Sequence, residues 1–353
     1  MKKIVFIVFI SVSGLTTAQN YKNSAPEIFF NRLPSAKTEA MGKILTLNLD
    51  PYFVSQSNPA SLLTTNSVAL FYSYSSPYYG LDNATYNCIG ASYNFPDIGA
   101  FALNALWYNT GLTFNQTGEG GPQVIGTFES TYQLYTLTYA HEIKDWFNFG
   151  VNANLFVNGL GPENYNSTFF ELGLSRKFTP IQYSTFKDEV LVATQLKNIF
   201  NQSINTIDQA GDEPFPTIFR IGISNLIEYS DKNVFEKSYL IGFTIGFEYQ
   251  DILNSKFRTA YKVGGELSIV DIIFLRGGYY NETERECDNC NGELEDFTYG
   301  FGLKLDFNKY LTKIFPLILL FDFVSLEQPT YITDKSNWDN FTTFTLIANY
   351  RIE

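Results

Sequence analysis

The chain has 353 residues and a formal net charge of −12, and it contains 33 Phe and 24 Tyr but only 2 Met. The acidic balance argues against nucleic acid as a partner, because surfaces that bind nucleic acid are basic. Charged residues make up 17% of the chain, and this low share with many aromatic residues is typical of strands that face lipid. A soluble β-sandwich with an aromatic core is the alternative.

Residues 1–18 have the organisation of a cleavable secretory signal. Lys2 and Lys3 form the charged start, residues 4–12 the apolar core, and residues 16–18 a cleavage site of small residues. The apolar core is shorter than the roughly 20 residues that a membrane-spanning helix needs. We therefore expect export through this signal peptide and localisation in the outer membrane of a Gram-negative cell.

From residue 67 to the end of the chain, apolar and polar side chains alternate in segment after segment. Residues 238–250 are the clearest case, with aromatic and Ile side chains on one face and Gly, Thr, Glu and Gln on the other. Alternation with period 2 predicts strands with one apolar and one polar face. The fourteen expected strands are 67–75, 86–95, 99–109, 129–141, 146–157, 168–179, 189–197, 217–226, 238–250, 256–267, 272–281, 296–307, 315–324 and 341–352.

Fourteen such strands predict an all-β fold, a transmembrane antiparallel β-barrel spanning residues 67–353. Connections after odd-numbered strands are mostly long and those after even-numbered strands mostly short, as in barrels with long extracellular loops and short periplasmic turns. We expect the outer face of this barrel to contact the lipid of the outer membrane. The extracellular loops expected to contact partners are 110–128, 198–216, 282–295 and 325–340.

Residues 19–66 lack strand alternation but keep apolar side chains such as Ile28, Phe29 and Leu47. A barrel of eight strands is filled by its own side chains, whereas 16 to 18 strands leave a channel. We therefore expect residues 19–66 to fold into the barrel as a plug or hatch, and a disordered periplasmic tail is the alternative.

Residues with catalytic chemistry are sparse. His141 is the single histidine, and no nucleophile elbow or phosphate-binding glycine loop accompanies it. We therefore expect no enzymatic activity, no catalytic residue, no cofactor and no dedicated metal site.

Cys287 and Cys290 lie in an acidic stretch, residues 282–296, and are separated by two residues. Outside the cytoplasm this spacing favours a small disulfide that braces the loop. A metal site built from these thiolates and nearby carboxylates is the alternative, and the acidic stretch also allows loose calcium binding or a solvated surface. Cys88 is expected to be an inert thiol.

Charged side chains of both signs lie on the polar face of the second half of the expected barrel. Mixed signs on adjacent strands favour an ionic lattice that braces the lumen, whereas a selective pore favours one dominant sign. A ladder that guides a substrate is the alternative. The residues of this predicted lattice are Arg220, Glu248, Arg258, Lys262, Glu266, Arg276, Lys304 and Asp306.

Several short stretches resemble one known family of barrels. Asn58, Pro59 and Ala60, which continue as Asn-Pro-Ala-Ser-Leu, resemble the N-terminal hatch signature of FadL-like barrels, in particular the PorV/PorQ-type proteins of the type 9 secretion system. The other resembling stretches are 196–198, 215–222, 264–266, 275–279 and 297–303. Residues 41–43 depart from the pattern, since Met-Gly-Lys stands where the family has paired glycines.

This resemblance implies a barrel of fourteen strands with an N-terminal hatch and a non-enzymatic role in protein secretion. The implied partners are components of the secretion system or exported cargo, bound through the long extracellular loops. The alternative implied by the wider FadL-like group is a transporter of hydrophobic small molecules. A structural barrel without a transport role is a third hypothesis.

Overall fold

The computed structural model describes residues 35–350 except for fourteen gaps. The expected signal peptide, Arg258, Cys287 and Cys290 lie outside the described residues, as do residues 19–34 of the expected plug. The gaps are 48–52, 65–67, 77–83, 96, 118–123, 144–145, 161–162, 184, 205–212, 231–238, 255–258, 284–292, 308–315 and 328–337.

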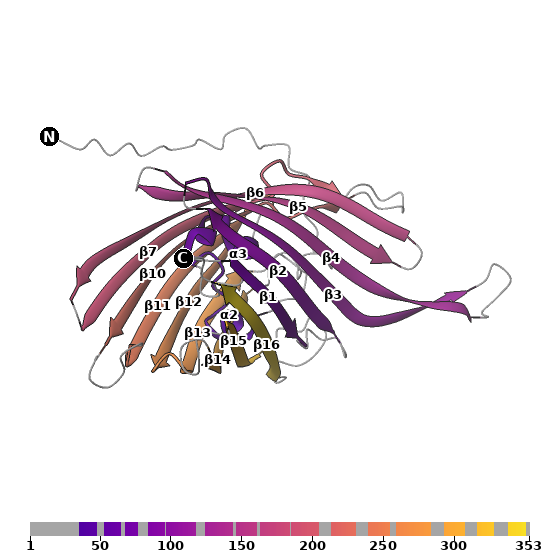
Figure 1. Ribbon diagram of the computed structural model, residues 1–353. Helices are drawn as coiled ribbons and strands as arrows, with labels where there is room; N and C mark the ends of the chain where they lie inside the picture. Colours follow the sequence, from indigo (N-terminus) through magenta and orange to yellow (C-terminus); the bar gives the residue numbers. More distant parts are fainter. Residues whose placement is uncertain are drawn as a thin grey trace.

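Fourteen antiparallel strands form one closed barrel, in which each strand pairs with its neighbours in the chain and the first pairs with the last (Figure 1). A small separate sheet of β8 (Ser203–Ile204) and β9 (Glu213–Pro214) lies in the connection between two wall strands. The wall strands are β1 (Val68–Ser75), β2 (Thr85–Phe95), β3 (Gly99–Thr117), β4 (Val124–Ile143), β5 (Phe147–Leu160), β6 (Glu163–Gln182), β7 (Phe186–Lys197), β10 (Ile218–Tyr229), β11 (Ile241–Ile252), β12 (Thr259–Ile269), β13 (Ile273–Thr283), β14 (Glu293–Asp306), β15 (Leu317–Glu327) and β16 (Trp338–Tyr350).

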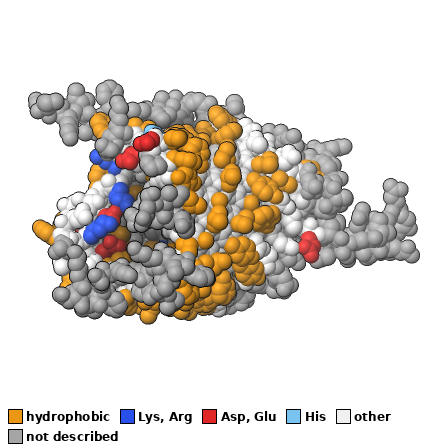
Figure 2. Space-filling model, in the orientation of Figure 1, with side chains coloured by type: hydrophobic (Ala, Val, Ile, Leu, Met, Phe, Trp, Pro, Cys, Tyr) orange, Lys and Arg blue, Asp and Glu red, His pale blue; other side chains and the backbone are white. Residues whose placement is uncertain are grey.

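The two faces of the wall differ as the alternation requires. In β11, the outward side chains of Ile241, Phe243, Ile245 and Phe247 are 42–46% exposed, whereas Glu248, the residue after Phe247, is fully buried. Figure 2 shows apolar side chains in oblique rows over the visible wall, with the charged side chains in view near its margins. An apolar outer wall and a closed ring of backbone hydrogen bonds are what a lipid bilayer demands of a spanning sheet. The prediction of a transmembrane antiparallel β-barrel of fourteen strands is therefore confirmed.

All fourteen predicted strands are present, but several are longer than predicted. β3 and β4 extend into the stretch 110–128, which was expected to be a loop, and Figure 1 shows their ribbon projecting past the neighbouring strands. The connection expected after residue 157 is short, because β5 ends at Leu160 and β6 begins at Glu163. Polar residues there continue the backbone pairing, and the short apolar run marks only the part that faces lipid.

The described part of the N-terminal segment forms three short elements: α2 (Ala36–Ala40), α3 (Val54–Ser57) and the 3₁₀-helix η1 (Pro59–Thr64). Ser35 caps α2 by accepting a hydrogen bond from the backbone N–H of Thr38. α2 lies against β13–β16, and η1 lies against β3–β6 on the other side of the barrel. Among the described residues, no helix is long and apolar enough to span a membrane.

Candidate functional site

Inward-facing side chains form an ionic half of the lumen, mainly on β7 and β10–β15, and an aromatic half, mainly on β2–β6, and the two overlap on β5 and β6. In the ionic half, Lys262 forms an ion pair with Glu248 at 2.9 Å and donates a second hydrogen bond to Gln250. Arg220 donates to the same Gln250 at 2.9 Å and to Gln195 at 3.0 Å. All of these side chains are buried, so each charge depends on its partners in place of water.

This network continues onto β5, β6 and β7, where the sequence had not predicted it. Glu171 pairs with Lys197 at 3.2 Å and accepts hydrogen bonds from Asn152 and Gln195. Gln195 therefore joins the Glu171 group to Arg220. The signal was present in the sequence, since Glu171 and Lys197 occupy the polar face of their strands.

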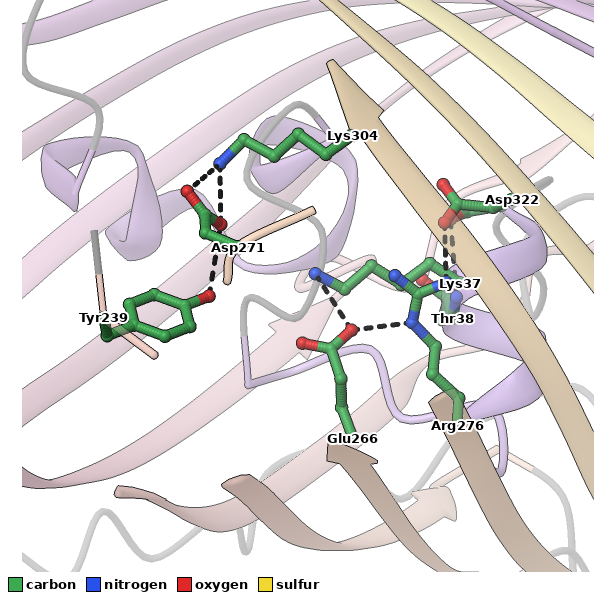
Figure 3. A network of polar contacts seen from close by, with 9 residues as sticks. Lys37, Thr38, Tyr239, Glu266, Asp271, Arg276, Lys304 and Asp322 are labelled. Atoms are coloured by element: carbon green, nitrogen blue, oxygen red, sulfur yellow. Dashed lines mark hydrogen bonds and ion pairs between the residues drawn. The ribbon is translucent and has the colours of Figure 1, made fainter. Parts of the chain in front are cut away.

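A second ionic group lies on β12, β13 and β15. The guanidinium of Arg276 donates to Glu266 and to Asp322, at 2.6 Å in each case, and Lys37 of α2 approaches Glu266 at 3.9 Å. Figure 3 shows Arg276 between the two carboxylates, with Lys37 reaching Glu266 from the N-terminal segment. The N-terminal segment therefore contributes a charge to the lattice.

Lys304 belongs to a third group at the turn between β12 and β13. It contacts both carboxylate oxygens of Asp271 at 3.0 Å, and the hydroxyl of Tyr239 donates to the same carboxylate at 3.1 Å (Figure 3). Burial and the adjacent carboxylate raise the pKa of the Tyr239 phenol, so it stays protonated and donates. Asp306 is half-buried on the same strand as Lys304, and Arg258 lies outside the described residues.

Glu248 also binds the N-terminal segment. Its carboxylate accepts hydrogen bonds from the backbone N–H groups of Leu45 and Thr46, at 2.9 and 2.6 Å. The side-chain amide of Asn58 donates to the carbonyls of Thr46, Leu174 and Thr194 over 3.3–3.4 Å. Asn58 therefore joins two parts of the segment to β6 and β7, and its own oxygen accepts from the N–H of Ala60 at 3.0 Å.

In the aromatic half, side chains of β2–β6 form a continuous band of rings, which we call the aromatic band: Tyr86, Tyr108, Tyr132, Phe156 and Phe169. The first four stack in sequence around the wall, with centroids 4.2, 6.0 and 5.9 Å apart and interplanar angles below 20°. All five rings are buried, although each is on the inward face of its strand. They belong to the largest apolar cluster of the described residues, which also includes Phe53 and Phe71.

Phe215, in the connection between β9 and β10, covers one end of the aromatic band. Its ring packs edge-on against Phe156 and Phe169, with centroids 5.4 and 5.7 Å away. The carbonyl of Phe215 accepts hydrogen bonds from the side-chain amides of Asn198 and Asn254, at 3.1 and 2.7 Å. These contacts fix the connection between β9 and β10 against the inner wall.

A hollow of about 660 Å³ lies on the wall formed by β1–β6, on the same strands as the aromatic band. Its apolar lining includes the outward Leu103, Leu137 and Leu155, with the small side chains of Ala105 and Ala153 between them. The hollow therefore presents an apolar surface to the surrounding lipid.

His141 and Cys88 take no part in the ionic groups. His141 lies on the outward face near the end of β4, where its Nδ1 is 3.2 Å from the carbonyl of Ile98. Cys88 is buried beside the aromatic band and lies 3.7 Å from the side-chain amide of Gln56. In the described part of the chain, no three His, Cys, Asp or Glu side chains gather closely enough to hold a metal ion.

These features define the chain as a transmembrane β-barrel of the outer-membrane type, with an inner wall that carries both ionic groups and an aromatic band. No protein-family model matches the sequence. No curated protein matches it either.

Solved structures of channels resemble the chain weakly. The toluene transporter TodX of Pseudomonas putida is 10% identical, with 92% of this chain and 100% of that chain covered and a TM-score of 0.48. The toluene transporter TbuX of Ralstonia pickettii is 10% identical, with coverages of 92% and 99% and a TM-score of 0.46. The CymD monoaromatic hydrocarbon channel is 10% identical, with coverages of 90% and 98% and a TM-score of 0.46.

Proposed function

We propose that this barrel binds apolar small molecules at the aromatic band and admits them across the outer membrane. The observation that carries this proposal is the band itself. Five rings occupy inward positions on adjacent strands, where a water-filled pore has polar side chains. Sites for apolar ligands are lined by aromatic and aliphatic side chains with few polar groups.

The ionic half of the lumen supports the same proposal, because its cations are paired with carboxylates. The cations Lys262, Lys197 and Arg276 are paired with carboxylates at 2.6–3.2 Å. Charges that neutralise each other in this way brace the wall and leave little net field to select an ion. We accordingly propose a structural role for the predicted lattice and not a substrate-guiding one.

Uptake of naphthalene by whole cells tests this function, in a Gram-negative host whose own channels for such solutes are deleted. Phe156→Ala removes an inward ring from the aromatic band, and Leu155→Ala shortens the adjacent outward side chain of the same strand. We expect the wild type and Leu155→Ala to accelerate uptake and Phe156→Ala to lose most of the acceleration. Equal uptake by all three, or no acceleration by the wild type, would reject the proposal.

A role in type 9 protein secretion is the second candidate function. The extended β3–β4 ribbon favours it, because a ribbon that projects beyond the neighbouring strands provides a surface for another protein. The contacts of Asn58 add support, since this residue begins the hatch signature of the resembling family. Purification of the barrel from its native membrane in mild detergent tests this candidate. Recovery of the translocon or of exported cargo with the barrel supports it, and recovery of the barrel alone counts against it.

We also propose that residues 1–18 are removed during export and that residues 19–66 plug the barrel. The contacts of α2 and η1 with opposite sides of the wall support the second proposal. Mass spectrometry of the purified protein tests the first, since the expected mature chain begins at Gln19. A mature chain that keeps Met1–Ala18 would reject it.

A further inference from the structure

Inward glycines of the wall lie where the backbone of the N-terminal segment touches it. At Gly264 of β12, an added Cβ would overlap the carbonyl group of Met41, and at Gly278 of β13 it would overlap the backbone of Met41 and Gly42. Gly264 and Gly278 are register partners, so they lie side by side on the two strands. We call such a site, where wall glycines leave room for the N-terminal segment, a glycine seat. Gly42 has a φ of 68°, and a Cβ there would in turn overlap the wall backbone at Val263.

A second seat holds the hatch signature on β5 and β6. A Cβ at Gly150 would overlap the backbone of Pro59 and Ala60, and a Cβ at Gly173 would overlap the side-chain oxygen of Asn58. Gly150 and Gly173 are also register partners. The segment therefore approaches the wall at backbone distance on two sides of the barrel.

A third seat is looser and holds the side chain of Leu47. Cβ atoms at Gly222 and Gly246 would each lie 3.0 Å from Leu47, closer than normal van der Waals contact. Leu47 is 2% exposed and packs with Met41 and Ile44 in one buried cluster. The seat fits a side chain of this size, and an alanine at either glycine would crowd it.

Side chains of the wall also form hydrogen bonds with backbone N–H and carbonyl groups of the N-terminal segment. The N–H of Ala36 donates to Thr343 at 2.8 Å, that of Gly42 to Thr298 at 3.1 Å, and those of Leu45 and Thr46 to Glu248. Thr298 donates in turn to the carbonyl of Ala40 at 3.0 Å. If the segment left the wall, these buried groups on both sides would lose their partners.

We infer that residues 35–47 and 58–60 form a permanent inner brace, which stays on its glycine seats while the protein works. A hatch that swings out has to break several buried hydrogen bonds and expose an apolar cluster in each cycle. Paired glycines on two sides of the barrel allow close backbone contact between the wall and the segment, and this close fit favours a segment that stays in place. This inference does not depend on the proposed function, because it concerns only how the segment is held.

Hydrogen exchange of the mature protein in lipid vesicles, measured by mass spectrometry, tests the brace. We expect amides in peptides covering residues 35–47 to exchange as slowly as amides of the barrel strands. Exchange near the rate of an unstructured peptide would overturn the inference, because it would mean that the segment leaves its seats readily.

Adjacent glycines provide matched controls. Gly278→Val places a branched side chain in the first seat, whereas Gly277→Val changes the neighbouring residue, whose Cβ would have its nearest neighbour at 3.9 Å. We expect exchange in residues 35–47 to rise about ten- to hundredfold in Gly278→Val and to stay unchanged in Gly277→Val. Equal protection of the amides of residues 35–47 in both variants would overturn the inference that Gly278 holds the segment. If Gly278→Val fails to fold, Gly264→Ala against Gly265→Ala repeats the comparison with a smaller side chain.

Discussion

Glu248 and Thr46 are separated by 202 positions in the sequence and joined by one of the shortest contacts between the wall and the N-terminal segment, 2.6 Å from the backbone nitrogen to the carboxylate. The same carboxylate holds Lys262 at 2.9 Å. Glu248 therefore links the ionic half of the lumen to the brace. Its loss removes an ion pair and two backbone hydrogen bonds together.

Replacement of Glu248 by Ala should destabilise the barrel by about 3–5 kcal/mol, because Lys262 then stays buried without its counter-ion. Urea unfolding in lipid vesicles measures the change in the free energy of unfolding. Glu142→Ala, which removes an exposed carboxylate, is the control. The double variant Glu248→Met/Lys262→Met should recover part of the loss. A single variant as stable as the wild type would show that the pair contributes little.

Asn58→Asp separates the two roles of Asn58. The carboxylate keeps an acceptor for the N–H of Ala60 but loses the three amide contacts to carbonyl oxygens. We expect Asn58→Ala to destabilise the protein by about 1–3 kcal/mol, because the three carbonyls lose a donor. Asn58→Asp should destabilise it more, because a buried carboxylate oxygen would then face those carbonyl oxygens without a donor between them. Unfolding of both variants in vesicles checks this. An Asp variant as stable as the wild type would contradict the assigned role of the amide.

Phe215→Ala should loosen the connection between β9 and β10 and destabilise the protein by about 3–5 kcal/mol, the usual cost of removing a buried ring. Phe200→Ala, in the connection between β7 and β8, is a matched control, since the Phe200 side chain is 64% exposed. Thermal unfolding and hydrogen exchange of residues 213–217 measure the effect. Equal behaviour of the two variants would show that Phe215 does not hold the connection against the aromatic band.

Charge on the outer wall tests the assignment of its lipid-facing surface. Ile245→Arg places a cation on the outward face of β11, which should cost about 2–4 kcal/mol if that position lies near the middle of the bilayer. Ile269→Arg, at the end of β12 and on the same face, should cost less because it lies nearer the interface. The folding yield and the free energy of unfolding in lipid vesicles show which of the two variants is destabilised more. The reverse ranking would mean that the membrane lies at a different height.

The alternation of apolar and polar side chains made the strands predictable. A shift of the strand register by one residue would turn the apolar side chains of a strand from the lipid toward the lumen. Ile241 to Phe247 show this, since their outward set was readable without any knowledge of strand partners. Strand ends were less predictable. Polar residues of β3 and β4 beyond the apolar part pair with each other, and period-2 hydrophobicity carries no signal for that pairing.

The aromatic band was missed for a related reason. Phe156 continues a face whose earlier members are Gly and Asn, and Phe169 lies beside the outward Phe170. Such positions, apolar on both faces, are the sequence signal for an apolar patch inside the lumen. The glycine seats carry no such signal. What Gly278 meets is the backbone of Gly42, 236 positions away, and only the fold brings them together.

The predicted lattice was partly accessible from sequence. Glu248, Lys262, Glu266 and Arg276 are on adjacent strands, and the alternation places them on one face. Partners such as Asp322 and Asp271 were not identified, because one lies two strands away from Arg276 and the other lies in a turn. The disulfide between Cys287 and Cys290 remains a prediction, which mass spectrometry of the non-reduced protein would test.

Naphthalene uptake by cells carrying Phe156→Ala, compared with Leu155→Ala at equal amounts of folded barrel, most directly tests the idea that the ring-lined side of the lumen takes apolar solutes. We predict near-normal uptake with the outward substitution and a severalfold loss with the inward one. Equal rates in the two strains would contradict the account.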